Sequence, residues 1–227
     1  MSFEPTDIFA HDAPEFAADA SSPKRSGPYR DIFKRMIDVG LVLLAAPFVI
    51  PVVLVLAVVV MRDGHMPFYW SERVGRGGRV FHMMKLRTMV PDADRRLSTH
   101  LASDRAAAAE WQETQKLKSD PRITVFGRIL RKTSLDELPQ LWNVLRGDMS
   151  LVGPRPMMPD QRKIYPGRAY YSLRPGVTGP WQVSDRNDCG FAKRADFDLD
   201  YARTLSFKND LHLIGRTVVV VLRGTGY

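Results

Sequence analysis

Cysteine is almost absent from this chain, which has only Cys189 among its 227 residues. A single cysteine excludes an internal disulfide and a cysteine-based metal site, and it favours a reducing compartment. The five histidines show no spacing typical of zinc ligands. Neither a Walker A loop nor a dinucleotide fingerprint occurs, because Gly75-Arg-Gly-Gly78 is too short and precedes a predicted strand.

A signal peptide is lacking as well. Residues 1–28 are rich in Ala, Asp, Ser and Pro, and they carry acidic residues where a signal peptide has a basic start followed by an apolar stretch. Because the segment has little hydrophobic periodicity, it predicts a disordered N-terminal tail.

Positive charge is in excess, with 33 Lys and Arg against 25 Asp and Glu and a net charge of +8. This excess favours anionic partners such as nucleic acid, anionic lipid or phosphorylated substrates, and it does not choose among them. No recognised nucleic-acid-binding module is present, so we expect no nucleic-acid partner. The chain is long enough for one sizeable core with an appended element.

The longest hydrophobic run extends from Val39 to Met61. At 1.5 Å per residue a helix of this length can cross a hydrocarbon core of ~30 Å. The run has no polar face, which argues against a buried helix of a soluble protein. Pro47 and Pro51 lie near its middle, where each removes a helical hydrogen bond and favours a bend.

Basic residues flank this run on both sides, which by the positive-inside rule indicates that both ends lie in the cytoplasm. Together with Pro47 and Pro51, the flanks predict that residues 29–62 form a re-entrant helix hairpin, which enters the bilayer, bends and returns. A straight single span is the alternative. An apolar hairpin can self-associate, so a homodimer is compatible with the sequence. The flanking residues are Lys24, Arg25, Arg30, Lys34 and Arg35 before the run, and Arg62, Arg73, Arg76 and Arg79 after it.

Residues 63–227 read as a separate domain outside the membrane. Two short strands, from Pro67 to Val74 and from Arg79 to Arg87, are joined by a glycine-rich turn and predict a β-hairpin. The predicted fold class is α+β and mainly helical. Helices are expected over residues 92–117, 124–131 and 194–205 and in a segment ending at Gly147; residues 160–171 are ambiguous, and residues 210–222 fit either type.

The segment from Thr133 to Pro156 contains two adjacent carboxylates, Asp136 and Glu137. Ser134 and Glu137 fit a capping box at the start of a helix, which would place Asp136 at the second helical position. There the exposed backbone N–H groups and the helix dipole favour an ionised carboxylate. Such a group can act as a nucleophile or as a Mg²⁺ ligand. A purely structural role for Glu137, as the partner of the cap, is the alternative.

Several basic residues accompany this pair. Lys85 and Arg87 end the second predicted strand, Arg128 and Arg131 lie on the preceding helix, and Arg155 follows in the loop. Arginine forks suit phosphate oxygens. Each residue taken singly fits an ordinary surface charge. Together, around a candidate metal ligand, they indicate a site for a diphosphate-bearing substrate.

The ordered motifs of the chain resemble those of the bacterial sugar transferase family, the small monotopic phosphoglycosyl transferases. The resemblance covers roughly 85% of the chain, from about Lys34 to the C-terminus, and the ending is most similar to the exopolysaccharide-initiating branch. The motifs that carry it are Lys34-Arg35-x-x-Asp38, Arg73-Val-Gly-x-x-Gly, Lys85-x-Arg87-Thr-Met, Ser134-Leu-Asp-Glu-Leu-Pro-Gln-Leu, Gly147-Asp-Met-Ser-Leu-Val-Gly-Pro-Arg-Pro156 and Arg174-Pro-Gly-Val-Thr-Gly-Pro-Trp-Gln-Val183.

The resemblance implies transfer of a sugar 1-phosphate, with galactose or glucose as the expected sugar, from a UDP-sugar to undecaprenyl phosphate. It implies that Asp136 is the nucleophile, forms an aspartyl-phosphosugar intermediate and helps to hold Mg²⁺, while Glu137 orients or tunes the site. Arg131 and Arg155 would bind phosphates, and Lys85 and Arg87 are further candidates for that role.

The resemblance also implies a re-entrant membrane helix, with the catalytic domain on the cytoplasmic side of the bacterial inner membrane. A membrane-tethered scaffold without catalysis is the alternative function. The chain departs from the family pattern at two places. Ala46-Pro47 replaces the Ser-Pro found at the bend in many members, and Asp185-Arg186 stands where many have Gly before the arginine.

Overall fold

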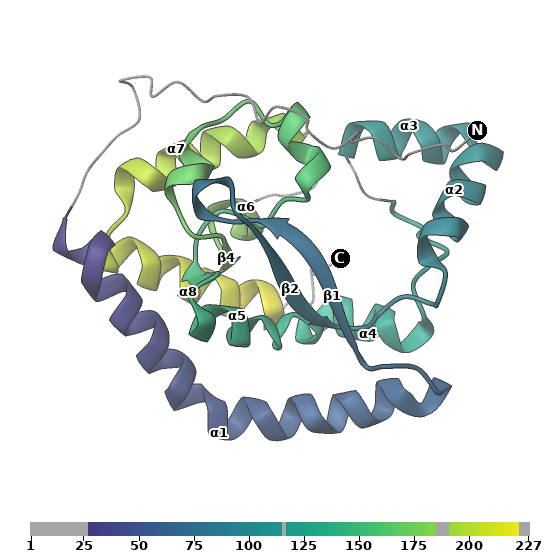
Figure 1. The fold of residues 1–227 in the computed structure, drawn as a ribbon, viewed down its shortest axis with the longest axis horizontal. Coiled ribbons are helices and arrows are strands. Elements are labelled where there is room, and N and C mark those ends of the chain that lie inside the picture. The colour runs from purple at the N-terminus through teal and green to yellow at the C-terminus, as the bar shows by residue number, and fades with distance from the viewer. Residues whose placement is uncertain (1–26, 115–116, 185–190, 223–227) are drawn as a thin grey trace, which may run out of the picture.

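A computed structural model describes residues 27–114, 117–184 and 191–222 of the protein. The fold is mainly helical, as predicted, and it contains two small sheets (Figure 1). Residues 1–26 of the predicted tail, as well as Asp185, Arg186 and Cys189, lie outside the described residues. The helices are α1 (Lys34–Val60), α2 (Ala93–Ser103), α3 (Arg105–Thr114), α4 (Val125–Thr133), α5 (Gln140–Arg146), α6 (Pro180–Val183), α7 (Arg194–Thr204) and α8 (Phe207–Leu222).

The predicted β-hairpin is confirmed. Strands β1 (Phe68–Val74) and β2 (Val80–Leu86) pair antiparallel, with Phe68 opposite Leu86 and Val74 opposite Val80. The tight turn between them uses Gly77 at φ 69° and Gly78 at φ 78°, a left-handed conformation in which a side chain would be strained. The glycine-rich segment is therefore a turn that aligns the two strands.

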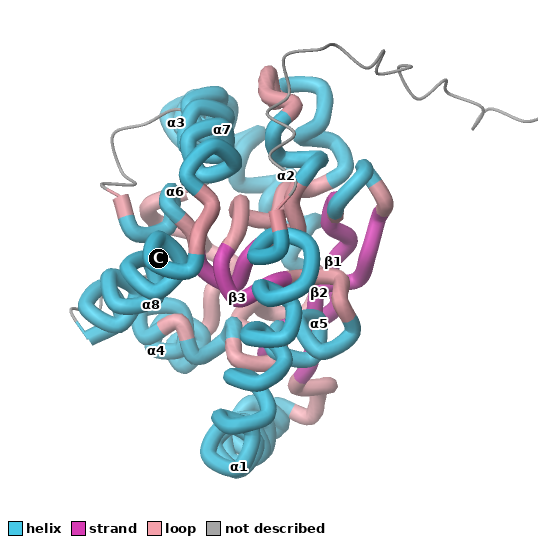
Figure 2. Tube along the Cα trace, turned by 90° about the vertical axis from the view of Figure 1, so that its left-hand side faces the viewer, coloured by secondary structure: helices cyan, strands magenta, loops and turns pink. Residues whose placement is uncertain are grey.

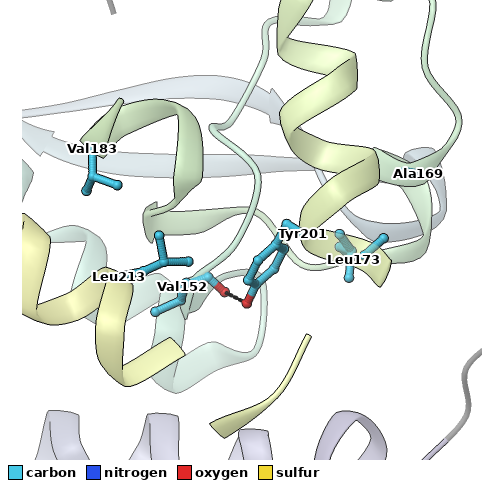
Figure 3. Packing of buried hydrophobic residues seen from close by; sticks show 7 residues of the cluster. Val152, Ala169, Leu173, Val183, Tyr201 and Leu213 are labelled. Atoms are coloured by element: carbon cyan, nitrogen blue, oxygen red, sulfur yellow. Dashed lines mark hydrogen bonds between the residues drawn. The ribbon is translucent and has the colours of Figure 1, made fainter. Parts of the chain in front are cut away.

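A second sheet was not predicted from the sequence. Strands β3 (Ser150–Val152) and β4 (Gly176–Thr178) pair in parallel, with Ser150 opposite Gly176. The buried side chains around this sheet come from β3, α6, α7 and α8, and Tyr201 lies among them (Figure 3). The Tyr201 hydroxyl lies 3.2 Å from the carbonyl oxygen of Val152 and 2.6 Å from Asp210 Oδ1, so α7 is joined to both β3 and α8.

Several predicted helices are confirmed and one is divided. Helix α4 begins after Thr124, whose Oγ1 accepts a hydrogen bond from the backbone N–H of Gly127 at 2.9 Å. The helix predicted over residues 92–117 is two helices, α2 and α3, because Asp104 adopts an extended backbone and caps α3. Its Oδ1 accepts hydrogen bonds from the N–H groups of Ala106 and Ala107. The ambiguous segment forms two 3₁₀ turns, Pro159–Ile164 and Ala169–Ser172.

Helix α1 is one continuous helix that bends. Its axis changes direction about halfway along its length (Figure 1), and Pro47 and Pro51 both lie inside it, near the middle. The bend agrees with the loss of hydrogen bonds expected at the two prolines. The predicted re-entrant hairpin is not shown by the structure, in which α1 bends but does not fold back on itself.

The N-terminal end of α1 is held against the domain by the Lys34-Arg35-x-x-Asp38 motif. Lys34 Nζ lies 2.6 Å from Asp210 Oδ2 on α8. The Arg35 guanidinium donates to the backbone carbonyls of Val144 and Leu145, the latter at 2.8 Å, near the end of α5. The buried Asp38 carboxylate accepts from the Ser150 hydroxyl at 2.7 Å and from the backbone N–H of Leu151 at 3.2 Å on β3.

The C-terminal end of α1 packs on the same domain. Ala57 and Val60 lie in a buried cluster with Leu86 of β2 and Leu130 of α4. Between the two ends the apolar side chains are uncovered: Leu44 is 72% exposed and Phe48 is 78% exposed. Figure 2 shows α1 along the bottom edge of the protein. The helix is long and apolar enough to enter a membrane, and its uncovered middle is the part that would do so.

We expect the substitution Gly127→Ala to destabilise the protein by about 1–3 kcal/mol, because the packing of α4 against the segment that follows β2 leaves no room for a methyl group. A Cβ atom there would lie 2.1 Å from the carbonyl oxygen of Thr88 and 2.8 Å from its carbonyl carbon, which are backbone atoms that cannot turn aside. Thermal unfolding of the detergent-solubilised chain measures the effect. Gly40→Ala on α1 is the matched control, since nothing lies within 4 Å of its Cβ position. Equal melting temperatures for the two variants would contradict this packing.

Candidate active site

The two predicted catalytic carboxylates lie in a tight turn between α4 and α5. Helix α4 ends at Thr133, and Ser134 takes the left-handed conformation with φ 57°, an uncommon geometry for a residue with a side chain. A 3₁₀ turn over Leu135–Glu137 follows, and α5 begins only at Gln140, after Pro139. The turn therefore presents Asp136 and Glu137 outside a regular α-helix.

The predicted capping box is wrong. Ser134 makes no side-chain capping hydrogen bond, and its left-handed backbone differs from the extended conformation of a residue that caps a helix. Pro139 instead sets where α5 starts, since a proline fits the beginning of a helix and not its interior. The predicted end of α5 at Gly147 is confirmed, and this residue has φ 88°.

Lys85 on β2 contacts both carboxylates. Its Nζ lies 2.6 Å from Glu137 Oε1 and 3.7 Å from Asp136 Oδ2. The position of β2 relative to α5 is fixed by Asn143, which is buried. Its side-chain oxygen accepts from the backbone N–H of Met84 at 3.0 Å, and its side-chain amide donates to the carbonyl of His82 at 2.8 Å. Asn143 thus pairs with the strand edge immediately before Lys85.

Asp136 is the more buried of the two carboxylates, with 7% of its side chain exposed against 22% for Glu137. Burial raises the pKa of Asp136, and the negative charge of Glu137 raises it further, while the nearby positive charges of Lys85 and Arg131 lower it. The net direction is upward. Additional positive charge in the site would therefore favour the ionised form that a nucleophile requires.

Arg131, a predicted phosphate ligand, lies close enough to Asp136 to interact with it electrostatically, and it also senses the charge of Arg155, another predicted phosphate ligand. Arg131 is in the last turn of α4. Burial lowers its pKa, the Asp136 carboxylate raises it, and the positive charge of Arg155 lowers it. The structure thus places Lys85 in contact with Asp136 and Glu137, and Arg131 within electrostatic reach of Asp136, while the phosphate-binding roles of Arg131 and Arg155 stay predictions.

Two further arginines belong to this group, and the sequence interpretation missed them as site residues. Burial lowers the pKa of Arg73, and so does the charge of Arg155, while Glu137 raises it. Burial and then the charge of Arg155 lower the pKa of Arg194 to about 10. Arg73 was predictable from strand alternation, because Tyr69 lies opposite Lys85 and residue 73 falls on the same face. No local pattern identifies Arg194, which reaches the site from α7.

Arg155 is positioned by the ring of Trp181, which the guanidinium groups of Arg155 and Arg194 both contact. Its guanidinium carbon lies 5.4 Å from the ring centre of Trp181 on α6, and that of Arg194 lies 5.1 Å from the same ring. Arg194 Nη2 also donates to the backbone carbonyl of Arg155 at 2.6 Å. Its Nε is buried with no hydrogen-bond partner among the described residues. The tight grouping of guanidinium groups favours binding of a multiply charged anion.

Two other predicted phosphate ligands, Arg87 and Arg128, are not among the residues that surround the carboxylate pair. The Arg87 guanidinium donates to Asp63 Oδ1 at 2.5 Å and Oδ2 at 2.7 Å, and to the carbonyls of Val60 and Met66. It therefore fastens the C-terminal end of α1 instead of facing Asp136. Arg128 is exposed on α4, and no contact of its side chain with the carboxylate pair is recorded among the described residues.

The donor set suits Mg²⁺ held jointly by protein and substrate. No cluster of three or more His, Cys, Asp or Glu side chains that could enclose a metal occurs in residues 27–114, 117–184 and 191–222. Mg²⁺ commonly binds through one or two carboxylates together with substrate phosphates, and it does not need a cage of protein ligands. Asp136 and Glu137 supply two such carboxylates, although Lys85 already contacts Glu137.

Residues 29–224, which contain this whole site, match the family model described as bacterial sugar transferase. The chain belongs to the bacterial sugar transferase family. The UDP-galactose-lipid carrier transferase of Erwinia amylovora is 43% identical over 96% of this chain and 46% of its own length. The undecaprenyl-phosphate galactose phosphotransferase of Salmonella typhimurium is also 43% identical, over the same shares of each.

A shorter member of the family is similar over nearly its whole length. The exopolysaccharide production protein ExoY of Sinorhizobium fredii is 43% identical over 90% of this chain and 93% of its own length. The chain spans about half the length of the Erwinia and Salmonella relatives.

We expect Asp136→Asn to leave this family member at least as stable as the wild type at about pH 8. Because burial raises the pKa of Asp136, folding is opposed once the carboxyl ionises. The stability of the wild type should therefore fall as the pH rises from the ordinary carboxyl value of ~3.9 through the raised value, and then level off. Melting temperatures across this range, with Asp160→Asn at an exposed carboxylate as the control, measure the effect. A variant that melts below the wild type at every pH would contradict it.

Proposed function

We propose that the protein transfers a hexose 1-phosphate, galactose or glucose, from a UDP-sugar to undecaprenyl phosphate in the initiation of exopolysaccharide repeat units. The observation that carries this proposal is the buried Asp136 carboxylate beside Lys85 and a group of buried arginines. Membership of the family supports the reaction class. The Erwinia and Salmonella relatives are both named as galactose transferases, which makes galactose the first sugar to test.

The first chemical step is a displacement at phosphorus. An Asp136 carboxylate oxygen attacks the β-phosphorus of the UDP-sugar, the bond from that phosphorus to the bridging oxygen breaks, and UMP leaves with the bonding electrons. The product is an aspartyl-phosphosugar. In the second step an oxygen of the lipid phosphate attacks the same phosphorus and releases the Asp136 carboxylate. The lipid thereby gains a diphosphate-linked sugar, and the nucleophile is regenerated.

The surrounding side chains have separate roles in this scheme. Lys85 stabilises the ionised form of Asp136 and, through its shorter contact with Glu137, fixes both carboxylates. Arg155, stacked on Trp181, and its neighbours Arg73 and Arg131 bind the negative charge of the two phosphates. Mg²⁺, which Asp136 would hold with Glu137 and substrate oxygens, supplies further positive charge at the transferring phosphate.

The attachment of α1 supports a re-entrant arrangement. A straight span would carry the two ends of the helix to opposite sides of the bilayer. Here the Lys34 end and the Val60 end both pack on the domain that holds Asp136, and the middle of the helix is uncovered. We therefore infer that α1 enters and leaves on the cytoplasmic face of the inner membrane, where a soluble nucleotide sugar and a lipid phosphate can meet.

Release of UMP from UDP-sugars tests the reaction. Purified protein with Mg²⁺ and polyprenyl phosphate should release UMP from UDP-galactose or UDP-glucose, and Asp136→Asn should lower the rate by at least ~10³-fold because it removes the nucleophile. Asp160→Asn should keep the wild-type rate. Release by Asp136→Asn at close to the wild-type rate would exclude Asp136 as nucleophile. If the wild type releases no UMP from any of the common UDP-sugars, the result would favour the non-catalytic scaffold.

The membrane arrangement is tested by labelling from outside the cell. Two single-cysteine variants, Ala20→Cys and His65→Cys, are made in a Cys189→Ser background. The first cysteine precedes α1 in the sequence and the second follows it. Both should resist a membrane-impermeant maleimide in intact cells and react after lysis, because both ends of α1 lie on the cytoplasmic side. Labelling of one site alone in intact cells would instead support a straight span.

A further inference from the structure

A second basic pocket lies beside the N-terminal end of α1, away from the carboxylate pair. Cationic side chains from three different parts of the chain line it, and none of the lining residues is Asp136, Glu137 or Lys85. The lining comprises Arg30, Lys34, Arg76, Ser150, Val152, Ser172, Leu173, Arg174, Tyr201 and Leu205. These segments come together because β3 packs against α1, and the 3₁₀ turn Ala169–Ser172 packs against both α7 and the turn of the β1–β2 hairpin.

The positive charge of this pocket is incompletely balanced. Lys34 is paired with Asp210, but no ion pair is recorded among the described residues for the other three lining cations. Arg30 donates to the carbonyl of Ser172 at 3.0 Å, and Arg174 donates to the carbonyl of Gly147 at 3.1 Å. Burial lowers the pKa of Arg174, and the charges of Arg76 and Arg35 lower it further. The carbonyl groups that accept from Arg30 and Arg174 are neutral, so they do not offset the positive charge. Cations this close to one another favour the binding of an anion between them.

The location of the pocket indicates where such an anion comes from. Arg30 and Lys34 contribute to the pocket, whereas Ile32, Phe33 and Met36 on the same stretch of helix are exposed by 52% or more. One face of this segment is thus apolar and uncovered, and it continues into the exposed middle of α1. A helix with these two faces lies naturally at the boundary between headgroups and acyl chains. The pocket then falls at the depth of the lipid phosphates.

We propose that this pocket binds the phosphate group of an anionic membrane phospholipid, between Arg30, Arg76 and Arg174. The phosphate oxygens accept hydrogen bonds from the guanidinium groups, and the acyl chains lie along the exposed apolar face formed by Ile32, Phe33 and Met36. The bound lipid offsets the repulsion among the cations and strengthens the attachment of the start of α1 to β3 and α7. The pocket is an anchoring site, and it is separate from the site that carries Asp136.

Thermal unfolding with defined lipids tests this site without any UDP-sugar. The full chain in phosphatidylcholine micelles is titrated with short-chain phosphatidylglycerol, and the wild type should show a saturable rise in melting temperature. Arg76→Ala should weaken the apparent affinity about tenfold, because it removes one charge-assisted contact. Arg76 suits this test because it is exposed in the hairpin turn and its loss breaks no recorded contact within the domain. Arg79→Ala, an equal change of charge in the same hairpin outside the pocket, should match the wild type.

Two further titrations identify the source of the phosphate. Inorganic phosphate at equal concentration should give little stabilisation, and a short-chain polyprenyl phosphate should stabilise the wild type and Arg76→Ala equally. The proposal is overturned if phosphatidylglycerol gives no saturable shift, if the two arginine variants respond alike, or if inorganic phosphate is as effective. Dependence of the polyprenyl phosphate response on Arg76 would assign the pocket to the acceptor lipid instead. Asp136→Asn should respond to phosphatidylglycerol as the wild type does, which keeps this test independent of the proposed reaction.

Discussion

The contact of Lys85 with Glu137 and Asp136 is the interaction on which the site depends. Two adjacent carboxylates, one of them almost fully buried, repel each other and lose hydration, so the turn that presents them requires a nearby positive charge. Lys85 supplies that charge from a different element. Asn143 fixes the edge of β2 one residue earlier, so the lysine reaches both carboxylates. Because Asp136 is still harder to ionise than a free carboxyl, the positive charge of Arg131 further favours its ionised form.

The end of β2 joins this site to the membrane helix through four consecutive residues. Lys85 contacts the carboxylates, and Leu86 packs against Ala57 and Val60 of α1. Arg87 binds Asp63 just beyond α1, and the carbonyl of Thr88 accepts a hydrogen bond from the backbone N–H of Thr124 at the start of α4. A displacement of α1 therefore acts on the same short segment that positions Asp136. This coupling explains physically how the long apolar helix and the carboxylate pair can share one small domain.

Local sequence patterns predicted the β-hairpin, α4, the end of α5 at Gly147 and the bent apolar helix. Lys85 contacts both carboxylates, while the phosphate-binding roles of Arg131 and Arg155 stay predictions. The local patterns were wrong on the capping box, because Pro139 moves the start of α5 and Ser134 turns left-handed. They also gave Arg87 a phosphate role, whereas the structure pairs it with Asp63. The parallel pairing of β3 with β4 and the approach of Arg194 to Arg155 join segments far apart in the chain, and no local periodicity encodes such contacts.

The most direct test of the account is a mass measurement on the enzyme during turnover. Protein incubated with UDP-sugar and Mg²⁺, without the lipid acceptor, is quenched in acid, digested and analysed by tandem mass spectrometry. The account predicts an added hexose phosphate on the peptide that contains Asp136, which disappears when polyprenyl phosphate is supplied before quenching. A reaction that releases UMP in step with formation of the lipid product, with no adduct on Asp136 in rapidly quenched samples, would contradict it.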